Sequence, residues 1–402
     1  MKILCAGILM GGFMFGAVRA DTVVQFNING SINGLYGTVN NYRVQLLDSQ
    51  APITVANFLT YVNNHNFDNT IIHRSVSDFI IQGGGFTNQL ASVVSYGPIQ
   101  NEFNSTRSNV RGTIAMAKLP DDANSATNQW FINVADNRLN LDNQNGGFTV
   151  FGKVIGEGMS VVDTINSIQT YNLGGNFTDI PLINYTPPNL YSSNLIGFTS
   201  VTVVPTIEWQ GGSSSGTTKW DLAANWTPGT TVPNGTGVNL VVGSQNSSYN
   251  VVDMASGGRT VGNIYYNSNV GTTIKSTGNY SLTIDNGTSP STINVLGNQT
   301  ISAPLILNSN TIFSGDGTLT LSGGVSSTHN MAVLDGSNII AKSINVNTIT
   351  LGAGTRITIQ PIPGGPLGEA IAPVPEPSAL VLLGIGISGL LGYGWRRLKS
   401  AA

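Results

Sequence analysis

The sequence is poor in the residues that build covalent and metal-bound sites. Its 402 residues include one cysteine, Cys5, and three histidines, His65, His73 and His329. A disulfide framework needs two or more cysteines, so it is excluded, and so is a cysteine-based metal site. Three scattered histidines leave little for a histidine-ligated metal. We therefore expect neither a metal nor a cofactor.

Charge is also scarce. Asp, Glu, Lys and Arg make up 9% of the chain, where about 25% is usual. The 17 basic and 20 acidic residues give a net charge of −3, which excludes a basic nucleic-acid-binding protein and a polyacidic tail protein. Glycine contributes 49 residues, about 12% against an average near 7%. With the abundant Asn, Ser and Thr, this composition indicates a β-rich, extracytoplasmic protein, and the length predicts two or three domains.

The first 20 residues have the pattern of a secretory signal peptide. Lys2 supplies a positive start, residues 3–17 are mainly apolar, and the small residues Val18 and Ala20 occupy the −3 and −1 positions of a cleavage site. We expect cleavage after residue 20. The alternative is a short N-terminal membrane anchor.

The C-terminal residues 374–402 combine three features of a sorting signal. A Pro-Glu-Pro-Ser motif at residues 375–378 precedes an uncharged apolar stretch at 379–395, and three basic residues follow by position 399. The stretch is at the lower limit for a transmembrane helix, and the basic end fits a cytoplasmic flank. The segment resembles the PEP-CTERM sorting signal.

This resemblance implies recognition by an exosortase-type processing enzyme in a Gram-negative bacterium that makes exopolysaccharide. It also implies transient membrane anchoring, cleavage near the motif, and delivery to the cell surface or the extracellular matrix. A permanent single-pass anchor is the alternative.

The part of the chain after the signal peptide, residues 21–205, mixes strand and helix patterns. Strands are indicated by alternation of apolar and polar residues, and helices by apolar residues at spacings of three and four. The predicted elements are strands over residues 24–28, 42–47 and 197–204, helices over 51–62 and 157–168, and a long loop over 169–193.

Residues 206–360 carry no strong helical period. Short runs of Val, Ile, Leu and Thr recur between Gly, Asn and Ser turns, which predicts an all-β domain. The segment resembles the β-solenoid-like regions of autotransporter and PEP-CTERM surface proteins, and a β-sandwich is the competing architecture. Trp209, Trp220 and Trp226 near its start are expected in the core rather than on a sugar-binding surface. Residues 361–373 are rich in Pro and Gly and read as a linker.

Four segments, in this order along the chain, together resemble the motifs of one known protein family. They are residues 51–62 (APITVANFLTYV), 71–86 (IIHRSVSDFIIQGGGF), 111–137 and 146–154 (GGFTVFGKV). Together they resemble a bacterial cyclophilin, a peptidyl-prolyl cis–trans isomerase, over residues 22–204. The resemblance implies a mainly β fold, namely a closed eight-stranded antiparallel β-barrel capped by two helices.

The same motifs imply a set of site residues. Arg74 matches the catalytic arginine of the family, and Phe79 and Gln82 complete the expected catalytic set. Asn137 to Asn140 match the far rim of the proline pocket, and His73 is expected to be structural. The expected substrate-binding residues are Ile80, Ala117, Lys118 through its backbone, Gln129, Phe131, Leu141 and Phe148.

Several positions depart from the family pattern. Many relatives have Pro-Gly where this chain has Ser77 and Asp78, and methionine where it has Ile80. Asn140 stands where many have an aromatic residue on which cyclosporin binding depends, so cyclosporin sensitivity is not implied. Phe148 replaces a histidine or tyrosine. None of these changes removes the arginine or the pocket.

The expected function is catalysis of X-Pro isomerisation. Rotation about a peptide bond faces a barrier of ~18–20 kcal/mol, and a catalyst that stabilises the twisted amide needs no nucleophile, metal or cofactor. We expect the clients to be proline-containing segments of exported proteins, met in the periplasm and then at the cell surface or in the matrix. The alternative is a non-catalytic protein that binds proline-containing peptides or has a structural role.

Overall fold

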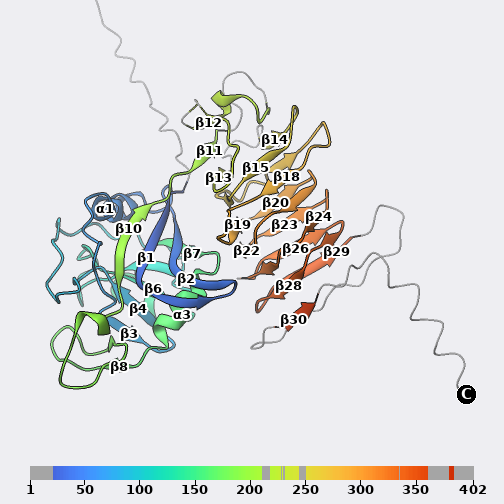
Figure 1. Cartoon of the computed structure of the whole chain (residues 1–402). Coiled ribbons are helices and arrows are strands. Elements are labelled where there is room, and N and C mark those ends of the chain that lie inside the picture. The colour runs from blue at the N-terminus through green and yellow to red at the C-terminus, as the bar shows by residue number, and fades with distance from the viewer. Residues whose placement is uncertain are drawn as a thin grey trace, which may run out of the picture.

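The described part of the chain forms two β domains that pack side by side (Figure 1). A computed structural model supplies the coordinates. The predictions for the signal peptide, for the linker and for nearly all of the sorting signal lie outside the described residues. The structure describes residues 21–210, 218–227, 229, 231–243, 250–334, 336–360 and 380–383.

Residues 22–204, here called the barrel, form one curved antiparallel sheet with strand order β10-β1-β2-β7-β5-β6-β4-β3. The predicted helices are present within one to two residues of their expected ends, and the predicted loop contains the short pair β8–β9. The elements are β1 (Val23–Gly34), β2 (Gly37–Leu46), α1 (Pro52–Asn63), β3 (Arg74–Val76), β4 (Ile80–Gly83), β5 (Thr113–Met116), β6 (Trp130–Asn133), α2 (Arg138–Leu141), β7 (Val150–Ile155), α3 (Gly158–Asn166), β8 (Thr170–Tyr171), β9 (Ile180–Pro181) and β10 (Phe198–Val203).

The barrel is only partly closed, which corrects the expectation of a closed one. The edge strands β3 and β10 share no continuous ladder, and the gap is bridged just before β3. There Ile71 and Gly197 form an isolated bridge, and the Phe198 amide donates to the Thr70 carbonyl at 2.8 Å. The close approach requires glycine, because a Cβ on Gly197 would lie 2.1 Å from the Thr70 oxygen.

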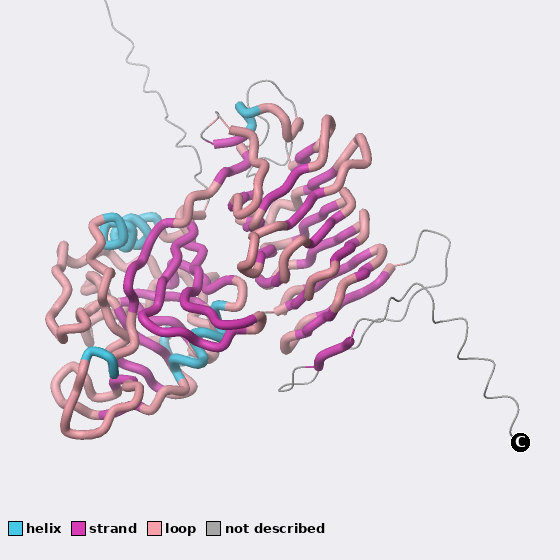
Figure 2. Tube along the Cα trace, viewed as in Figure 1, coloured by secondary structure: helices cyan, strands magenta, loops and turns pink. Residues whose placement is uncertain are grey.

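Aromatic side chains fill the barrel interior. The Phe26 ring stacks on Tyr42 at 4.8 Å and meets the edges of Trp130 and Phe198 at 5.2 Å each. Offset-stacked and edge-to-face pairs of this kind add to the free energy gained by burial. Helix α1 packs on this core through Phe58, which is buried. Figure 2 shows the described helices in the barrel, apart from one 3-10 turn (Ala223–Asn225) near the start of the second domain.

Residues 207–359, here called the solenoid, form a parallel β-solenoid, so the β-sandwich alternative is wrong. The middle coils stack Ile293 on Phe313 and Phe313 on Val333, two steps of 20 residues each. Three sheets surround an apolar core.

Their strands are β11 (Ile207–Trp209), β12 (Trp226–Thr227), β13 (Asn239–Val242), β14 (Val251–Asp253), β15 (Arg259–Val261), β16 (Asn263–Tyr266), β17 (Thr273–Lys275), β18 (Leu282–Ile284), β19 (Ser291–Val295), β20 (Asn298–Ile301), β21 (Leu305–Leu307), β22 (Thr311–Gly315), β23 (Thr318–Leu321), β24 (Val325–Ser327), β25 (Met331–Val333), β26 (Asn338–Ala341), β27 (Ile344–Asn345), β28 (Thr348–Leu351) and β29 (Arg356–Ile359).

The two ends of the solenoid are covered differently. At the first coil, the rings of Trp209, Trp220 and Trp226 are fully buried against one another, as expected for core residues. At the last coil, β30 (Leu380–Leu383) pairs antiparallel with β28. These four residues belong to the predicted transmembrane segment 379–395, the rest of which lies outside the described residues. Over the described ranges, no helix is both long and apolar enough to cross a membrane.

The barrel contacts the solenoid through its strands β1, β2 and β7. The apolar centre of the contact is a buried cluster of Val23, Ile155 and Val204 from the barrel with Val241 and Tyr265 from the solenoid. Since these side chains are almost fully buried, the two domains share a core at this point.

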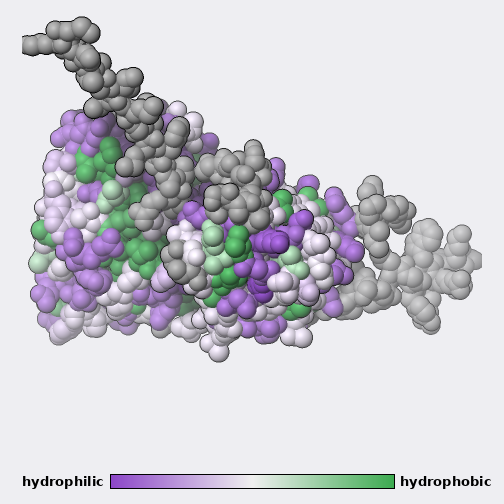
Figure 3. All heavy atoms as spheres, turned by 90° about the horizontal axis from the view of Figure 1, so that it is seen from above, coloured by the Kyte–Doolittle hydropathy of each residue, from purple (hydrophilic) through white to green (hydrophobic). Residues whose placement is uncertain are grey.

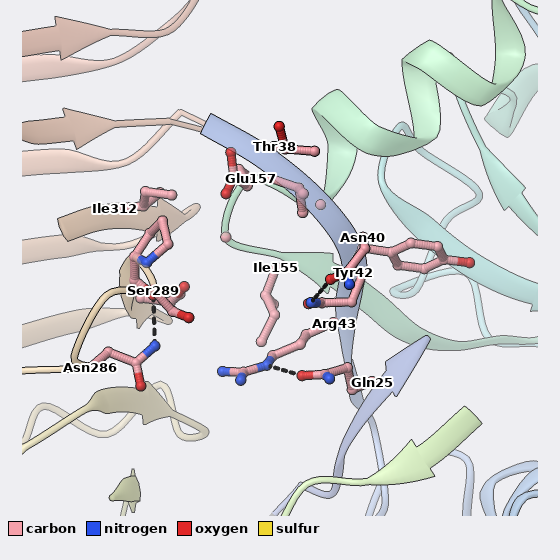
Figure 4. A pocket seen from close by; sticks show the side chains of 16 residues that line it. Gln25, Thr38, Asn40, Tyr42, Arg43, Ile155, Glu157, Asn286, Ser289 and Ile312 are labelled. Atoms are coloured by element: carbon pink, nitrogen blue, oxygen red, sulfur yellow. Dashed lines mark hydrogen bonds between the residues drawn. The ribbon is translucent and has the colours of Figure 1, made fainter. Parts of the chain in front are cut away.

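Polar side chains continue the contact away from that core. Asn294 donates to Gln45 at 2.7 Å and accepts from Ser314 at 3.1 Å, while the Gly156 amide donates to the same Ser314 hydroxyl at 3.0 Å. Beside them lies a groove of about 310 Å³ lined from both domains. Figure 4 shows Arg43 at this groove, bonded to Gln25.

The surface reflects the low charge content of the chain. On the face seen in Figure 3, hydrophilic and hydrophobic residues are intermixed over both domains. Several ion pairs of the described residues lie at exposed positions, such as Arg111 with Asp163 at 2.6 Å. Pairs exposed to this extent contribute little to stability, so we assign the stability to the two apolar cores and their shared contact.

The polar part of the contact gives a first prediction. Asn294→Ala should lower the free energy of unfolding by about 1–3 kcal/mol, because it leaves the buried Gln45 and Ser314 groups without their partner. Chemical denaturation of the full chain measures this. Thr320→Ala, a half-buried position on β23, is the control and should change it by about 0.5 kcal/mol or less. Equal effects of the two substitutions would contradict the bridging role of Asn294.

Candidate active site

The register of three neighbouring strands builds one side of the site. Arg74 on β3 lies opposite Gln82 on β4, and Gln82 lies opposite Phe131 on β6. Residues directly opposite each other in an antiparallel sheet point to the same face. The three side chains therefore form a row across the outer face of the barrel.

Alternation along the strands separates this outer row from the barrel core. Ile81 and Ile132 point inward and belong to the aromatic interior. Ile80 and Phe131 point outward and belong to a separate apolar cluster. The sheet thus has an apolar patch on its outer surface at this position, where solvent-facing residues would normally be polar.

Loops on both sides turn this patch into a pocket of about 220 Å³. The Phe131 and Phe148 rings meet edge to face at 5.8 Å, and Leu141 closes the floor. Nine of the ten residues expected from the sequence line it, together with Gln144. The lining is Arg74, Phe79, Ile80, Gln82, Ala117, Lys118, Phe131, Leu141, Gln144 and Phe148.

The tenth expected residue, Gln129, does not line the pocket but hydrogen-bonds Gln82, which does. Its side-chain oxygen accepts from the Gln82 amide at 2.9 Å, so it orients Gln82. His73 is buried beside this pair, and burial lowers the His73 pKa to about 4. His73 is therefore neutral near pH 7 and belongs to the support of the glutamine pair, consistent with a structural residue.

Arg74 stands at the rim of the pocket. Its side chain is 37% exposed, and its Nε lies 3.6 Å from the Asp179 carboxylate. Asp179 is itself tied to β3, because its carbonyl accepts from the Ser75 amide at 2.8 Å. The guanidinium thus lies at the pocket rim beside a carboxylate from the long loop after α3.

The structure accounts for two of the departures from the family pattern. Asp78 has a φ of 54°, the left-handed conformation that glycine usually supplies and that Asp tolerates better than most residues. The tight turn between β3 and β4 therefore persists without Pro-Gly. Asn140 does not line the pocket, and its side chain accepts from Gln144 at 2.6 Å.

Sequence reasoning missed three features of the site. Gln144 lies between two of the four matching segments, and Asp179 lies in the long loop with no motif to mark it. The Lys118 side chain lines the pocket, although only its backbone was expected to matter. Across the described ranges, no group of three or more His, Cys, Asp or Glu side chains is placed to hold a metal ion.

The sequence of this part of the chain is similar to those of known proteins. A peptidyl-prolyl cis-trans isomerase of Acinetobacter baylyi is 40% identical over 169 residues, which is 42% of this chain and 84% of the relative. The chain belongs to the cyclophilin family. The family model described as cyclophilin type peptidyl-prolyl cis-trans isomerase/CLD matches residues 33–186.

Three further comparisons concern a second relative, a solved structure and the sorting motif. Peptidyl-prolyl cis-trans isomerase B of Escherichia coli is 42% identical over 142 residues, covering 34% of this cyclophilin and 85% of the relative. A crystal structure of a cyclophilin type isomerase from Cryptosporidium parvum is 23% identical, covering 46% of this chain and 99% of that one, with a TM-score of 0.34. The PEP-CTERM protein-sorting motif matches residues 373–398 and indicates export.

The buried histidine gives a prediction on pH. The pKa of His73 falls from its ordinary 6.5 to about 4 in the folded chain, so between these values only the unfolded chain binds the proton. The free energy of unfolding should therefore fall as the pH drops through this window, by about 3 kcal/mol at most. His73→Gln should remove this loss, measured by chemical denaturation at several pH values.

His65→Gln is the matched control, because the His65 side chain is 70% exposed. Asp21 changes the free energy of unfolding in the opposite direction as the pH drops. Burial, with repulsion from Asp48, raises the Asp21 pKa to about 7, so the folded chain binds this proton more tightly. The His73 contribution is accordingly read as the difference between the two variants. Identical pH dependence in both would contradict the assignment.

Proposed function

We propose that this cyclophilin is an exported peptidyl-prolyl isomerase that accelerates X-Pro isomerisation in other exported proteins. The observation that carries the proposal is the row of Arg74, Gln82 and Phe131 at the mouth of an apolar pocket. The reaction needs a charged donor for the amide nitrogen, an amide to orient the substrate and a hydrophobic pocket for the proline ring.

In this proposal the pocket binds the proline ring and the rim acts on the peptide bond. Phe131, Leu141 and Phe148 surround the ring, with Phe79 and Ile80 beside it. As the amide twists, its nitrogen loses resonance and becomes a better acceptor, and the Arg74 guanidinium donates to it. A donor that gains strength only in the twisted state lowers the barrier without tightening the ground state.

The remaining residues hold the substrate chain. Gln82, held by Gln129, orients the carbonyl that precedes the proline, and the strand end at Ala117 and Lys118 supplies backbone bonds. The Ala117 amide already donates to the Gln129 carbonyl at 2.9 Å, which fixes this edge beside the glutamine pair. No nucleophile or cofactor takes part in the proposed step.

We further propose the route by which the protein reaches its clients. Residues 1–20 would direct export and be removed, and residues 374–402 would anchor the chain transiently until an exosortase-type enzyme cuts near the Pro-Glu-Pro motif. The sorting motif supports this route. The isomerase would then act in the periplasm and finally at the cell surface or in the extracellular matrix, where exopolysaccharide is a candidate contact.

A second candidate is a non-catalytic role, in which the pocket only grips proline-containing segments. The observation that favours it is the size of the solenoid, whose apolar core and parallel coils suit a structural arm. The two candidates differ in one measurable respect, since only the first requires Arg74 to act on the rate.

Arg74→Ala tests the choice. The substitution should lower kcat/KM for a proline peptide by about 10²–10³-fold, the usual loss on removing one preorganised donor. Stopped-flow isomerisation by the full chain measures it, with Arg356→Ala, exposed on the last coil, as the control. An active Arg74→Ala variant would contradict the proposed mechanism, and peptide binding without turnover in the unsubstituted protein would favour the second candidate.

A further inference from the structure

The Lys118 side chain joins two parts of the pocket that are distant in sequence. Lys118 follows β5, and its ammonium donates to the carbonyls of Asn145 and Gly147, each at 2.6 Å. The same nitrogen lies 4.7 Å from the centre of the Phe148 ring. One side chain thus contacts both the loop before Phe148 and Phe148 itself.

The loop before Phe148 has an unusual backbone. Asn145, Gly146 and Gly147 have φ values of 51°, 70° and 74°, a run of left-handed residues. On the other side of the loop, the Asn101 amide donates to the Gly146 and Gly147 carbonyls at 2.8 and 3.1 Å. Two donors from separate parts of the chain therefore hold this segment.

The segment has little room to move inward. A Cβ on Gly147 would lie 2.3 Å from the Phe103 ring, so the loop is already in close contact with the barrel on that side. Phe148 is the next residue, and its ring lines the pocket in edge-to-face contact with Phe131. The position of that wall depends on the position of the loop.

We propose that the Lys118 side chain is a positioning residue that fixes Phe148 as the wall of the proline pocket and so determines affinity for the proline ring. The inference deepens the proposed function and rests on the same pocket. An ammonium suits this role because it has three donors and no acceptor, and because it is attracted to the face of an aromatic ring.

A competing role for the same charge is direct recognition of the substrate. Arg74 and Lys118 are the two charged residues among those that line the described pocket, so an acidic residue next to the proline could be attracted to them. The contacts favour positioning, since the Lys118 ammonium is engaged by two carbonyls and a ring. The two roles differ in their dependence on the charge of the peptide.

The test compares Lys118→Met with Lys118→Arg in the full chain. Met keeps the stem and loses the donors and charge, whereas Arg keeps both. For an uncharged Ala-Pro-Phe peptide, Lys118→Met should raise Kd by about three- to tenfold, the range of a partly desolvated cation–π contact. Its kcat should stay within about twofold, because the reacting amide is untouched. Lys118→Arg should restore most of the affinity.

A Phe148→Leu background supplies the matched control. If Lys118 acts through Phe148, Lys118→Met should add little to the loss caused by Phe148→Leu. NMR titration gives Kd and shows that each variant is folded. It also reports the Lys118 ε-methylene protons, which the Phe148 ring should shift upfield in the unsubstituted protein and not in Phe148→Leu.

Four results would overturn the inference. They are an unchanged Kd in Lys118→Met, an undiminished effect in the Phe148→Leu background, a loss confined to peptides with Glu beside the proline, and the absence of the ring-current shift. Failure of the proposed catalysis is distinguishable, because it appears as binding without turnover in the unsubstituted protein. The shift is measured without any peptide, so it tests the contact even if no peptide binds.

Discussion

The site depends on the antiparallel register of β3, β4 and β6. Hydrogen bonds between these strands fix which residues lie opposite each other, and that choice brings Arg74, Gln82 and Phe131 into one row. A slip of one residue would turn the whole row into the barrel core. The register is held from inside by Ile81 and Ile132, which are fully buried, so the core that stabilises the barrel also positions the site.

One part of the curved sheet carries the pocket, and another part contacts the solenoid. Strands β5, β6, β4 and β3 carry the pocket on their outer face, while β1, β2 and β7 present their outer face to the solenoid. The substrate pocket and the domain contact therefore lie on separate stretches of one sheet. Because the solenoid docks on β1, β2 and β7, it leaves the pocket lining on the other strands intact.

Much of the fold could be predicted because its signals are local. Helix α1 follows from apolar spacing in residues 51–62, and most of the site residues follow from motifs within residues 71–86, 111–137 and 146–154. The barrel closure and the domain contact could not be predicted. Gln45 and Asn294 are 249 residues apart, and nothing near either residue marks the other as its partner.

In the solenoid and at the pocket rim, too, local sequence did not suffice to predict the structure. Repeating β patterns predicted the strands and favoured a solenoid, but they left a sandwich open because both architectures alternate apolar and polar residues. Gln144 and the Lys118 side chain escaped notice since their roles depend on the path of a loop with left-handed residues. The local sequence pattern indicates which side chains face a core. Which of the remaining side chains contact one another depends on loop geometry.

The central claim is that the row on β3, β4 and β6 catalyses rotation about X-Pro bonds. Magnetisation exchange by NMR tests it most directly, using a proline peptide with separate cis and trans signals and a small amount of the full chain. The account predicts exchange cross-peaks between the two signals when the protein is added. Their absence, while Phe131 and Phe148 resonances still shift on peptide binding, would contradict it.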